Sequence, residues 1–508
     1  MLLLVLSGPE TSIIPRRCRT ALRQDKAERP CHVCPEIRRS FVIASGRNTV
    51  RRHSLAGLLY NTVHTHRRSL SMTFRPKPVE SRVECNLESS LMKLNAFPTA
   101  TILVTAVTIG VQFTVPGRTA AQVDRRRVVV MSPAATQLHQ SVLLFDGHND
   151  LPWAFRERGT PNFERLNIAL PSPELHTDIG RLRLGGVKAQ FWSVYVPVSS
   201  RVNGESLQQT LEQIDFVHAL VQHYPDTFSF CRSTGDIEHA VGEGKIASLI
   251  GVEGGHSIEN SLAVLQKLYD LGARYMTLTH SATLDWADAS TDEGKHGGLT
   301  EFGERVVTKM NELGMLVDLS HVADDTMRDA LRVTKAPVIF SHSSARAICD
   351  HPRNVPDDIL PLVKANRGVI MVNFYSGFVA PGAGNRYRLL QQSIKVWKES
   401  GEDEQAIADK STAWEKTHPI PRGSIHDVVD HIDHLVKLTS IECIGIGSDF
   451  DGIPVVPEQL EDVSMYPFLT QELLNRGYSE ASIRKIMGEN VMRVFREAEA
   501  VAIQLTSK

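Results

Sequence analysis

Cysteine is scarce in this chain of 508 residues, which contains only seven. Four of them fall within the first 91 residues, and the other three are Cys231, Cys349 and Cys443. Three cysteines provide no disulfide framework for the larger part of the chain. Cys31 and Cys34 have the spacing of a zinc knuckle, but no second pair is placed to complete four ligands. The sequence therefore indicates neither a disulfide framework nor a cysteine zinc site.

An Asn-x-Ser/Thr acceptor for glycosylation and a hydrophobic C-terminal tail are also missing, so no glycolipid anchor is expected. An apolar run does extend from about Ala100 to Val115, after Met92 and before small residues near Ala120. This pattern predicts a secretory signal peptide over residues 92–121. The run is short for a membrane span, which needs about 20 residues, so an uncleaved signal anchor is the alternative. We expect a secretory location, extracellular or membrane-associated.

Charge is low overall but unevenly distributed. The formal net charge is −2, yet residues 1–91 contain sixteen Lys and Arg against seven Asp and Glu, which leaves about −11 for the remainder. The first 91 residues are rich in Arg and Ser and show no sustained periodicity, which predicts a disordered extension. A signal that begins at Met92 indicates that this extension comes from an upstream start or a misjudged gene model, the alternative being a basic presequence. A composition of 42% hydrophobic and 22% charged residues excludes disorder throughout.

From about Ser141 onward, short runs rich in Val, Ile, Leu and Phe alternate with longer stretches of helical period, which is typical of repeated βα units. Plausible helices include residues 206–224, 261–272 and 301–314, and the last two end at glycine, as helices often do. Eight strand-like runs can be counted. They span residues 142–150, 187–196, 246–254, 274–281, 315–322, 337–343, 369–375 and 443–452.

Six of these eight runs have a His, Asp or Glu at or near their C-terminal end. In a closed parallel barrel the strand ends converge on one face, so residues far apart in sequence meet in one pocket. A doubly wound open sheet would not bring six strand ends to one point. We therefore predict an α/β fold, a (β/α)₈ TIM barrel of the metal-dependent hydrolase type, over residues 141–500.

The strand ends carry the residue types of a metal site. His148 and Asp150 are two apart at a strand end, so both side chains can reach one ion. His321 and His342 each follow an apolar strand directly. Glu253 ends another strand and precedes two glycines, and a metal site would remove the cost of burying its carboxylate.

Two carboxylate oxygens can bridge two cations about 3.5 to 4 Å apart. We predict His148 and Asp150 on one ion, His321 and His342 on the other, and Glu253 shared between them. Nitrogen and oxygen ligands without thiolate favour Zn²⁺, with manganese and cobalt as alternatives. Two such ions would lower the pKa of a bridging water toward about 7 and supply hydroxide.

At this point the motifs themselves match a known family. DGHND, GVEGGHS, TLTHS, DLSHV, IFSHSSA, RNVPDD and GSDFDG, in this order, closely resemble the renal or membrane dipeptidases, zinc peptidases of the amidohydrolase-like barrels. The resemblance extends from about Leu144 to the C-terminus. It implies the two-zinc site described above, dipeptide substrates and, in some members, cysteinyl-glycine conjugates and β-lactams.

The resemblance also implies roles for three further residues. His280 would contact the substrate and polarise the scissile carbonyl, Arg353 would bind the free C-terminal carboxylate, and Asp449 would handle protons. Physical reasoning agrees, because His280 and Asp449 sit at strand ends and a loop guanidinium can pair bidentately with a carboxylate.

The sequence departs from vertebrate members at Ala282, where they have a cysteine, so that disulfide is not expected here. Residues 386–422 are long, charged and helix-like, and could form a lid or a dimer contact. His426, His431 and His434 look like a ligand cluster, but they are predicted to lie on the solvated face of an amphipathic helix.

The sequence thus predicts a zinc dipeptidase, a hydrolase that forms a homodimer, associates with a membrane or is secreted, and binds no nucleic acid. One alternative is another two-metal amidohydrolase acting on a lactone or phosphoester, which would favour a strand-end Lys where this chain has Glu253. The other is an inactive barrel kept as a binding protein. The presence of all five ligands and of Asp449 argues against it.

Overall fold

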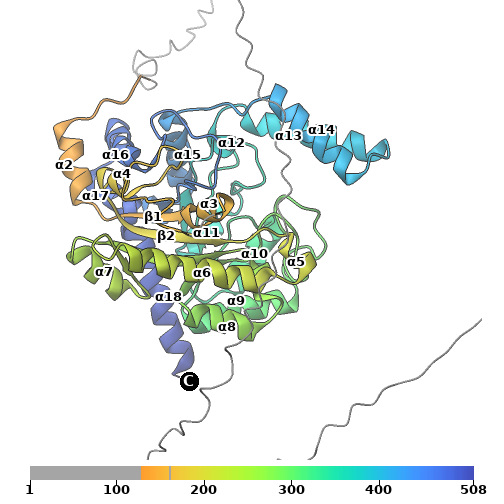
Figure 1. Ribbon diagram of the computed structural model, residues 1–508, viewed down its shortest axis with the longest axis horizontal. Coiled ribbons are helices and arrows are strands. Elements are labelled where there is room, and N and C mark those ends of the chain that lie inside the picture. The colour runs from red at the N-terminus through yellow and green to blue at the C-terminus, as the bar shows by residue number, and fades with distance from the viewer. Residues whose placement is uncertain (1–126, 160–161, 508) are drawn as a thin grey trace, which may run out of the picture. The chain divides into compact units, whose positions relative to one another are not determined.

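The computed structural model describes residues 127–159 and 162–507, which lie in one compact unit, Ile109–Lys508 (Figure 1). The predicted disordered extension, the predicted signal at residues 92–121 and the Cys31–Cys34 pair lie outside the described residues. In the part of the chain that is described, no helix is both long and apolar enough to cross a membrane.

The fold is a closed barrel of eight parallel strands, as predicted. The sheet order is β2-β1-β9-β8-β7-β6-β5-β4-β3, and β2 also pairs with β4, which closes the ring. All eight predicted runs form barrel strands. They are β1 (Leu144–Asn149), β2 (Val187–Tyr195), β4 (Ile246–Glu253), β5 (Ala273–Thr277), β6 (Leu316–Asp318), β7 (Ile339–Phe340), β8 (Val369–Val372) and β9 (Ile444–Ile446).

The closing pair is the longest in the barrel. It joins β2 and β4 in unbroken register from Ala189↔Ala247 to Tyr195↔Glu253. The short strand β3 (Phe228–Phe230) pairs with the first three residues of β4 and stays outside the ring, because β5 pairs with β4 only from Ile250 onward. Sequence reasoning missed β3, since three residues are too few to show an alternating pattern.

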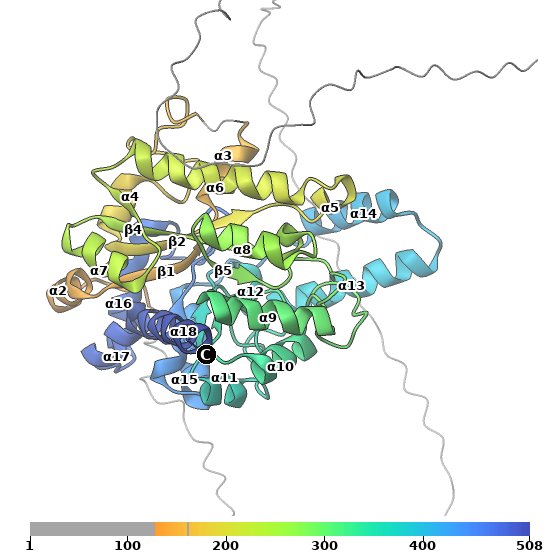
Figure 2. The same ribbon diagram turned by 90° about the horizontal axis from the view of Figure 1, so that it is seen from below.

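Helices surround the barrel, as the view in Figure 2 shows. The predicted helices at 206–224, 261–272 and 301–314 are α6 (Ser206–His223), α8 (Leu262–Asp270) and α9 (Glu301–Leu313). Gly314 ends α9 in the left-handed conformation, at φ 73°. The other α-helices are α2 (Pro133–Ser141), α3 (Leu151–Glu157), α4 (Ile179–Leu184), α5 (Ser200–Asn203), α7 (Thr234–Gly242), α10 (Asp324–Val333), α11 (Leu360–Asn366), α12 (Ser376–Val379), α13 (Ala383–Glu399), α14 (Glu404–Thr417), α15 (Ile425–Leu438), α16 (Tyr466–Asn475), α17 (Glu480–Arg484) and α18 (Asn490–Thr506).

Short helices of other types complete the fold. Three are 3₁₀ helices, η1 (Gly255–Ile258), η2 (Ile441–Cys443) and η3 (Val463–Met465), and η4 (Lys485–Glu489) is a π-helix. α2 lies before the predicted domain range of 141–500 and α18 runs past it.

Side chains fill the barrel interior, so the barrel is a packed core, and the strand ends form its mouth. Phe145, Phe191, Tyr275 and Met371 are fully buried and belong to one cluster drawn from strands around the ring. On β2, Phe191 belongs to this inner cluster, whereas its neighbour Trp192 packs in the larger cluster formed with the surrounding helices. The alternation is the strand periodicity of two, with one face toward the axis and the other toward the helices.

The segment predicted to be long and helix-like forms the pair α13 and α14, which project from the side of the barrel in both views (Figures 1 and 2). α14 has no buried residue, and α13 buries only three. A helix pair with so little buried surface depends on its ends for attachment.

One expectation about α15 is wrong. The helix forms as predicted, but His426 and His431 are buried, and His434 is half-buried against Asp357 at 2.8 Å. The ring of His431 accepts a hydrogen bond from the Ala345 backbone N–H and donates one to the Val379 carbonyl. These contacts make His431 a structural residue, and the error came from treating histidine and aspartate as solvent-facing types.

Candidate active site

The predicted ligands stand at the carboxyl ends of four barrel strands. Asp150 comes directly after β1, Glu253 ends β4, His321 follows β6 and His342 follows β7. Two site residues have backbone conformations that non-glycine residues rarely adopt, with φ 70° at His321 and 67° at Asp449. Such outliers often occur at functional sites, where the surrounding structure holds them.

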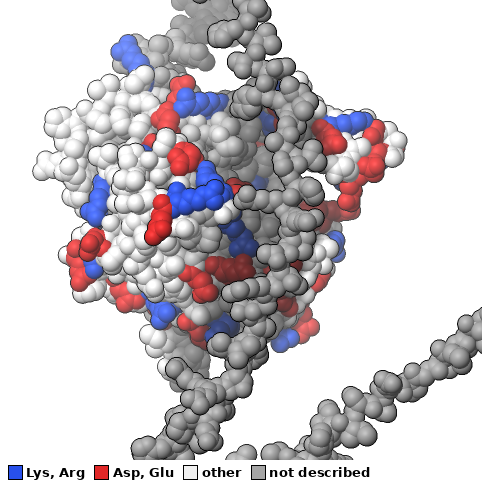
Figure 3. Space-filling model, in the orientation of Figure 1, with Lys and Arg blue, Asp and Glu red and all other residues white. Residues whose placement is uncertain are grey.

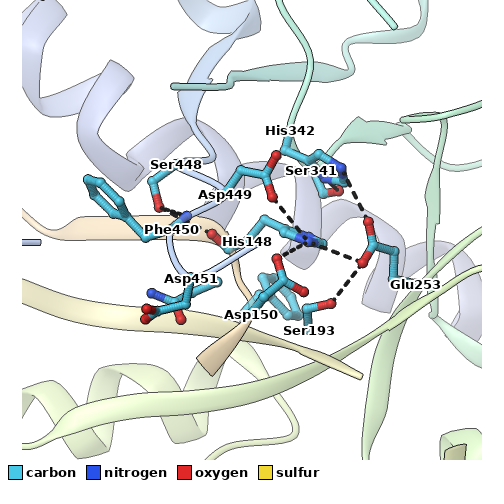
Figure 4. A network of polar contacts seen from close by, with 12 residues as sticks. His148, Asp150, Ser193, Glu253, Ser341, His342, Ser448, Asp449, Phe450 and Asp451 are labelled. Atoms are coloured by element: carbon cyan, nitrogen blue, oxygen red, sulfur yellow. Dashed lines mark hydrogen bonds and ion pairs between the residues drawn. The ribbon is translucent and has the colours of Figure 1, made fainter. Parts of the chain in front are cut away.

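Glu253 lies at the centre of the cluster, and its two oxygens face different partners. One oxygen is 3.5 Å from Nε2 of His148. The other is 3.0 Å from Nε2 of His321 and 3.4 Å from Nε2 of His342. Asp150 lies 3.2 Å from His148, and Figure 4 shows the His148 ring between the carboxylates of Asp150, Glu253 and Asp449. The two carboxylate oxygens of Glu253 thus face the two predicted ligand pairs.

Hydrogen bonds from deeper in the barrel orient two of the histidines. The Tyr275 hydroxyl lies 2.8 Å from Nδ1 of His148. The Ser341 hydroxyl lies 2.8 Å from Nδ1 of His342 and donates to the buried carboxylate of Asp318 at 2.6 Å. Partners on Nδ1 leave Nε2 free to bind an ion, which is the usual arrangement around metal-bound histidines.

Burial and neighbouring charges shift the pKa values of the titratable groups in this site. Burial alone would raise the pKa of Glu253, but the interactions with His148 and His321 outweigh burial and bring the pKa well below its usual value. Burial lowers the pKa of His321 and of His342 well below the usual value, and Arg353 adds to both effects. Glu253 is therefore ionised and the rings of His321 and His342 are neutral, the protonation states that metal ligands require. His148 differs: burial lowers its pKa, but Tyr275, Glu253 and Asp150 raise it well above the usual value.

The geometry fits a metal ion. The Nε2 atoms of His321 and His342 lie only 2.9 Å apart, and Nε2 of His148 is buried without a hydrogen-bond partner in the described structure. Three groupings of carboxylate and imidazole atoms each converge closely enough to hold an ion: His148, Glu253 and His342; Glu253, His280 and His321; and His148, Asp150 and Asp449. The structure thus brings all five predicted ligands together, and places His280 and Asp449 beside them.

His280 and Asp449 face the cluster from β5 and β9. Nε2 of His280 lies 3.8 Å from Glu253, and its ring packs on Tyr195 with the centroids 4.8 Å apart. Burial raises the pKa of Asp449 to about 8, and Asp150 and Glu253 add to this rise while His148 opposes it. Asn373, directly after β8, donates a hydrogen bond to Asp449 at 2.8 Å.

Arg353 is buried in the pocket wall with donors to spare. Its guanidinium donates one hydrogen bond to the His342 carbonyl at 3.3 Å and stacks 5.2 Å from the Phe378 ring centroid. Nε and Nη1 are buried without a partner among the described residues. Burial lowers the pKa of Arg353 to about 10, which still leaves it cationic at neutral pH. An unsatisfied, buried guanidinium next to a metal-ligand cluster is suited to bind an anionic group.

The pocket that contains these residues has a volume of about 380 Å³. Sequence reasoning missed several of its walls: Trp153, Glu157, Tyr195, Tyr375 and Phe378. The position of Tyr195, the last residue of β2, was a usable signal, because every strand end faces this pocket.

Three residues near the site have structural roles. Nε2 of His256 donates to the Val196 carbonyl, and burial lowers the pKa of His256 to about 4, so it stays neutral. Trp286 is buried in the core and is not part of the pocket lining. Asp288 accepts hydrogen bonds from the backbone of Lys295 and Gly298 and so fixes its own loop.

Solved structures share this fold. A probable dipeptidase, PvdM from Pseudomonas aeruginosa, is 24% identical, with a TM-score of 0.65 over 72% of this chain and 98% of that one. A metallo peptidase from Rhodobacter sphaeroides, solved with a phosphinate mimic of L-Ala-D-Ala, is 22% identical, with a TM-score of 0.58 over 70% of this chain and 99% of that one.

The family itself is shown by sequence. The model of the membrane dipeptidase family, peptidase family M19, matches residues 133–508, which include every strand of the barrel and every candidate site residue. The chain therefore belongs to the membrane dipeptidase family and is a hydrolase of the metallo-dipeptidase class.

Proposed function

We propose that the protein hydrolyses dipeptides with a free C-terminal carboxylate, with two zinc ions held by the five predicted ligands. The observation that carries this proposal is the unsatisfied, buried guanidinium of Arg353 in the same pocket as the ligand cluster. A cationic anchor beside a metal-ligand cluster selects a short acyl compound with a carboxylate at a fixed distance from the reacting bond.

The choice of ions rests on the donor set. His148 and Asp150 would hold one ion and His321 and His342 the other, with one oxygen of Glu253 on each side. All donors are imidazole nitrogens or carboxylate oxygens, which suits zinc. When bound, such ions lower the pKa of a water molecule and polarise a carbonyl oxygen.

The protein's own residues would then position the substrate and move its protons. Arg353 binds the substrate carboxylate, and His280, at the rim of the cluster, donates a hydrogen bond to the scissile carbonyl oxygen. Asp449 accepts a proton from the attacking water and delivers it to the leaving amine, because cations beside it would keep it ionised at the start. Asn373 holds Asp449 in place through its 2.8 Å hydrogen bond.

Two features oppose the alternatives. A lactone or phosphoester hydrolase with a carbamylated lysine would need a lysine in the site, and the described residues that line the pocket include none. An inactive binding protein would have no need for the complete ligand set. Cysteinyl-glycine conjugates and β-lactams share the amide and carboxylate of a dipeptide, and we include them in the proposed substrate range.

The cellular setting is part of the same proposal. A secretory location, outside the cell or at a membrane, is supported by the signal-like sequence of residues 92–121. A homodimer is supported by the projecting pair α13 and α14, which exposes the apolar side chains of Leu389 and Val396.

Hydrolysis of Gly-D-Phe tests the proposed activity. The full chain is assayed as purified, after chelation and after addition of zinc, with the metal content measured at each stage. We expect activity to disappear with the metal and to return with two zinc ions per chain. A fully zinc-loaded protein that cleaves neither Gly-D-Phe nor Gly-L-Phe would overturn the proposal.

A further inference from the structure

Glu157 lines the pocket from a different part of the barrel than Arg353. It is the last residue of α3, which follows β1, and it lines the pocket together with Trp153 of the same helix and Tyr195 of β2. Arg353 comes from the loop after β7, and around the ring β9 and β8 separate β1 from β7 on the shorter side. The lining of the pocket thus includes a cationic residue on one side of the barrel mouth and an anionic residue three strands away around the ring.

The charge of Glu157 is left uncompensated, although it has an arginine on each side in the sequence. Arg156 pairs with Glu212 at 2.8 Å. Arg158 donates to the backbone carbonyls of Ala154 and Glu174, at 2.9 and 2.8 Å. Across residues 127–159 and 162–507, no cationic side chain forms an ion pair with Glu157, which is exposed. Its charge is therefore available to a molecule that enters the pocket.

The field of Glu157 also reaches into the pocket. Burial raises the pKa of the Tyr195 hydroxyl, and Glu253, Asp150 and Glu157 all add to that rise. Tyr195 in turn packs edge-on against Trp153, with ring centroids 4.9 Å apart, and contacts the tilted ring of His280, the candidate substrate-contacting residue. Two aromatic rings thus line the path from the cluster to the carboxylate.

A dipeptide bound as proposed would place its first residue on this wall. The substrate carboxylate would bind Arg353, and the scissile bond would lie at the cluster. The side chain of the first residue can then reach Glu157 by lying along Trp153 and Tyr195. Helix α3 has seven residues, so at about 1.5 Å per residue Glu157 lies about 10 Å along the helix from Asp150. That is too far for the α-amino group, which is two bonds from the scissile carbonyl carbon, but within reach of a long side chain.

We infer that Glu157 selects dipeptides whose first residue has a long cationic side chain, lysine or arginine. The methylene groups of such a side chain lie along the aromatic rings of Trp153 and Tyr195, and the charge meets the carboxylate of Glu157. This inference rests on the proposed dipeptidase function. Because Glu157 is exposed, the ion pair contributes selectivity of modest size.

Competing substrates test the inference in the full, zinc-loaded chain. The kcat/KM values of Lys-D-Phe, norleucyl-D-Phe and Glu-D-Phe are compared, since norleucine matches lysine without its charge. We expect Lys-D-Phe to exceed norleucyl-D-Phe by about three- to fivefold, the size of an exposed ion pair, mainly through a lower KM. The ratio should fall toward one in Glu157→Gln and at about 0.5 M NaCl.

Charge reversal and a remote control complete the design. Glu157→Lys should invert the order of Lys-D-Phe and Glu-D-Phe. Glu174→Gln removes the same charge from an exposed position outside the pocket and should keep the wild-type ratio.

The outcomes separate the two proposals. A protein that cleaves all three dipeptides with a lysine-to-norleucine ratio of one, or whose ratio is the same in Glu157→Gln, overturns the role of Glu157 and leaves the dipeptidase function standing. A zinc-loaded protein that cleaves none of the three overturns both.

Discussion

The hydroxyl of Tyr275 lies 2.8 Å from Nδ1 of His148, at the innermost point of the ligand cluster. The Tyr275 ring occupies the space beside Gly251, where an added Cβ would come within 1.9 Å of the ring. Gly251 precedes Glu253 on β4 by two residues, so the same strand makes room for the tyrosine and supplies the carboxylate that faces both candidate ligand pairs. A glycine in this strand thus permits the contact that orients a histidine on β1.

This contact makes a prediction for metal binding. Tyr275→Phe removes the partner of His148 Nδ1 and leaves the ring in place, so we expect zinc affinity at that position to fall about tenfold to hundredfold. Competition with a chromophoric chelator measures the affinity. Tyr224→Phe, which removes a hydroxyl bonded to Asn167 at 3.0 Å, is the control and should bind zinc normally. Equal affinities in the two variants would contradict the positioning role.

Glu253 faces both ligand pairs, so its removal should affect both ions. We expect Glu253→Ala to bind at most one zinc ion per chain and to lose activity by a factor of about 10³ or more, because the carboxylate shared between both sides is gone. Metal analysis of the purified variant after dialysis gives the stoichiometry. A variant that retains two ions would show that Glu253 is not the bridge.

Arg353 should determine the requirement for a free carboxylate. In the wild type, replacing the C-terminal carboxylate of Gly-D-Phe by an amide should lower kcat/KM by about tenfold to a hundredfold, the value of a charged hydrogen-bonded contact. In Arg353→Met the two substrates should be cleaved at similar, low rates. Persistent discrimination in that variant would assign carboxylate recognition to another group.

His431 should make the fold sensitive to acid. Burial lowers its pKa from 6.5 to about 4 in the folded protein, while its hydrogen bonds require the neutral ring. Between these values the unfolded chain binds a proton that the folded chain does not, so the free energy of unfolding falls as the pH drops from about 6.5 to 4. The full effect is about 3 kcal/mol.

Urea unfolding of the metal-free protein between pH 7.5 and 4.5 measures this dependence. His431→Gln keeps a donor and an acceptor but cannot bind a proton in this range. The slope of its free energy of unfolding against pH should therefore correspond to about one proton fewer than in the wild type. The same pH dependence in both proteins would place the acid sensitivity elsewhere.

The fold could be predicted from sequence because its signal is repeated. Each of the eight strands is an apolar run, and most are followed by a polar residue that faces the same pocket. The same arrangement at His148, Glu253 and His342 therefore supports the assignment of each strand. β3 escaped because Phe228–Phe230 is short and lies outside this repetition. Such a strand depends on its pairing with β4, which the sequence does not display.

The sequence identified the candidate ligands that the structure brings together, and it identified fewer of the residues around them. His148, Glu253 and His342 stand at strand ends and could be found there. Tyr275 could not, since it lies within β5 and is buried in the barrel interior, where its position in the sequence pattern is that of any core residue. The structural role of His431 likewise follows from its burial, and the sequence of an amphipathic helix does not show whether a histidine faces the core or the solvent.

Surface charge gave little guidance. On the face in Figure 3, Lys and Arg lie among Asp and Glu, with no area given over to one sign. The informative charges are instead the partly unsatisfied guanidinium of Arg353, which the family resemblance already indicated, and the carboxylate of Glu157, which only the three-dimensional arrangement identifies.

The distribution of the candidate ligands over β1, β4, β6 and β7 would make the stability of the fold depend on the supply of metal. Strand ends this far apart in the chain meet only when the ring is closed, so an unfolded chain offers an ion no comparable site. An ion that binds only the folded chain raises the free energy of unfolding, by about 4 kcal/mol when its free concentration is a thousand times its dissociation constant. Loss of the metal would thus lower the stability of the folded protein as well as abolish its activity.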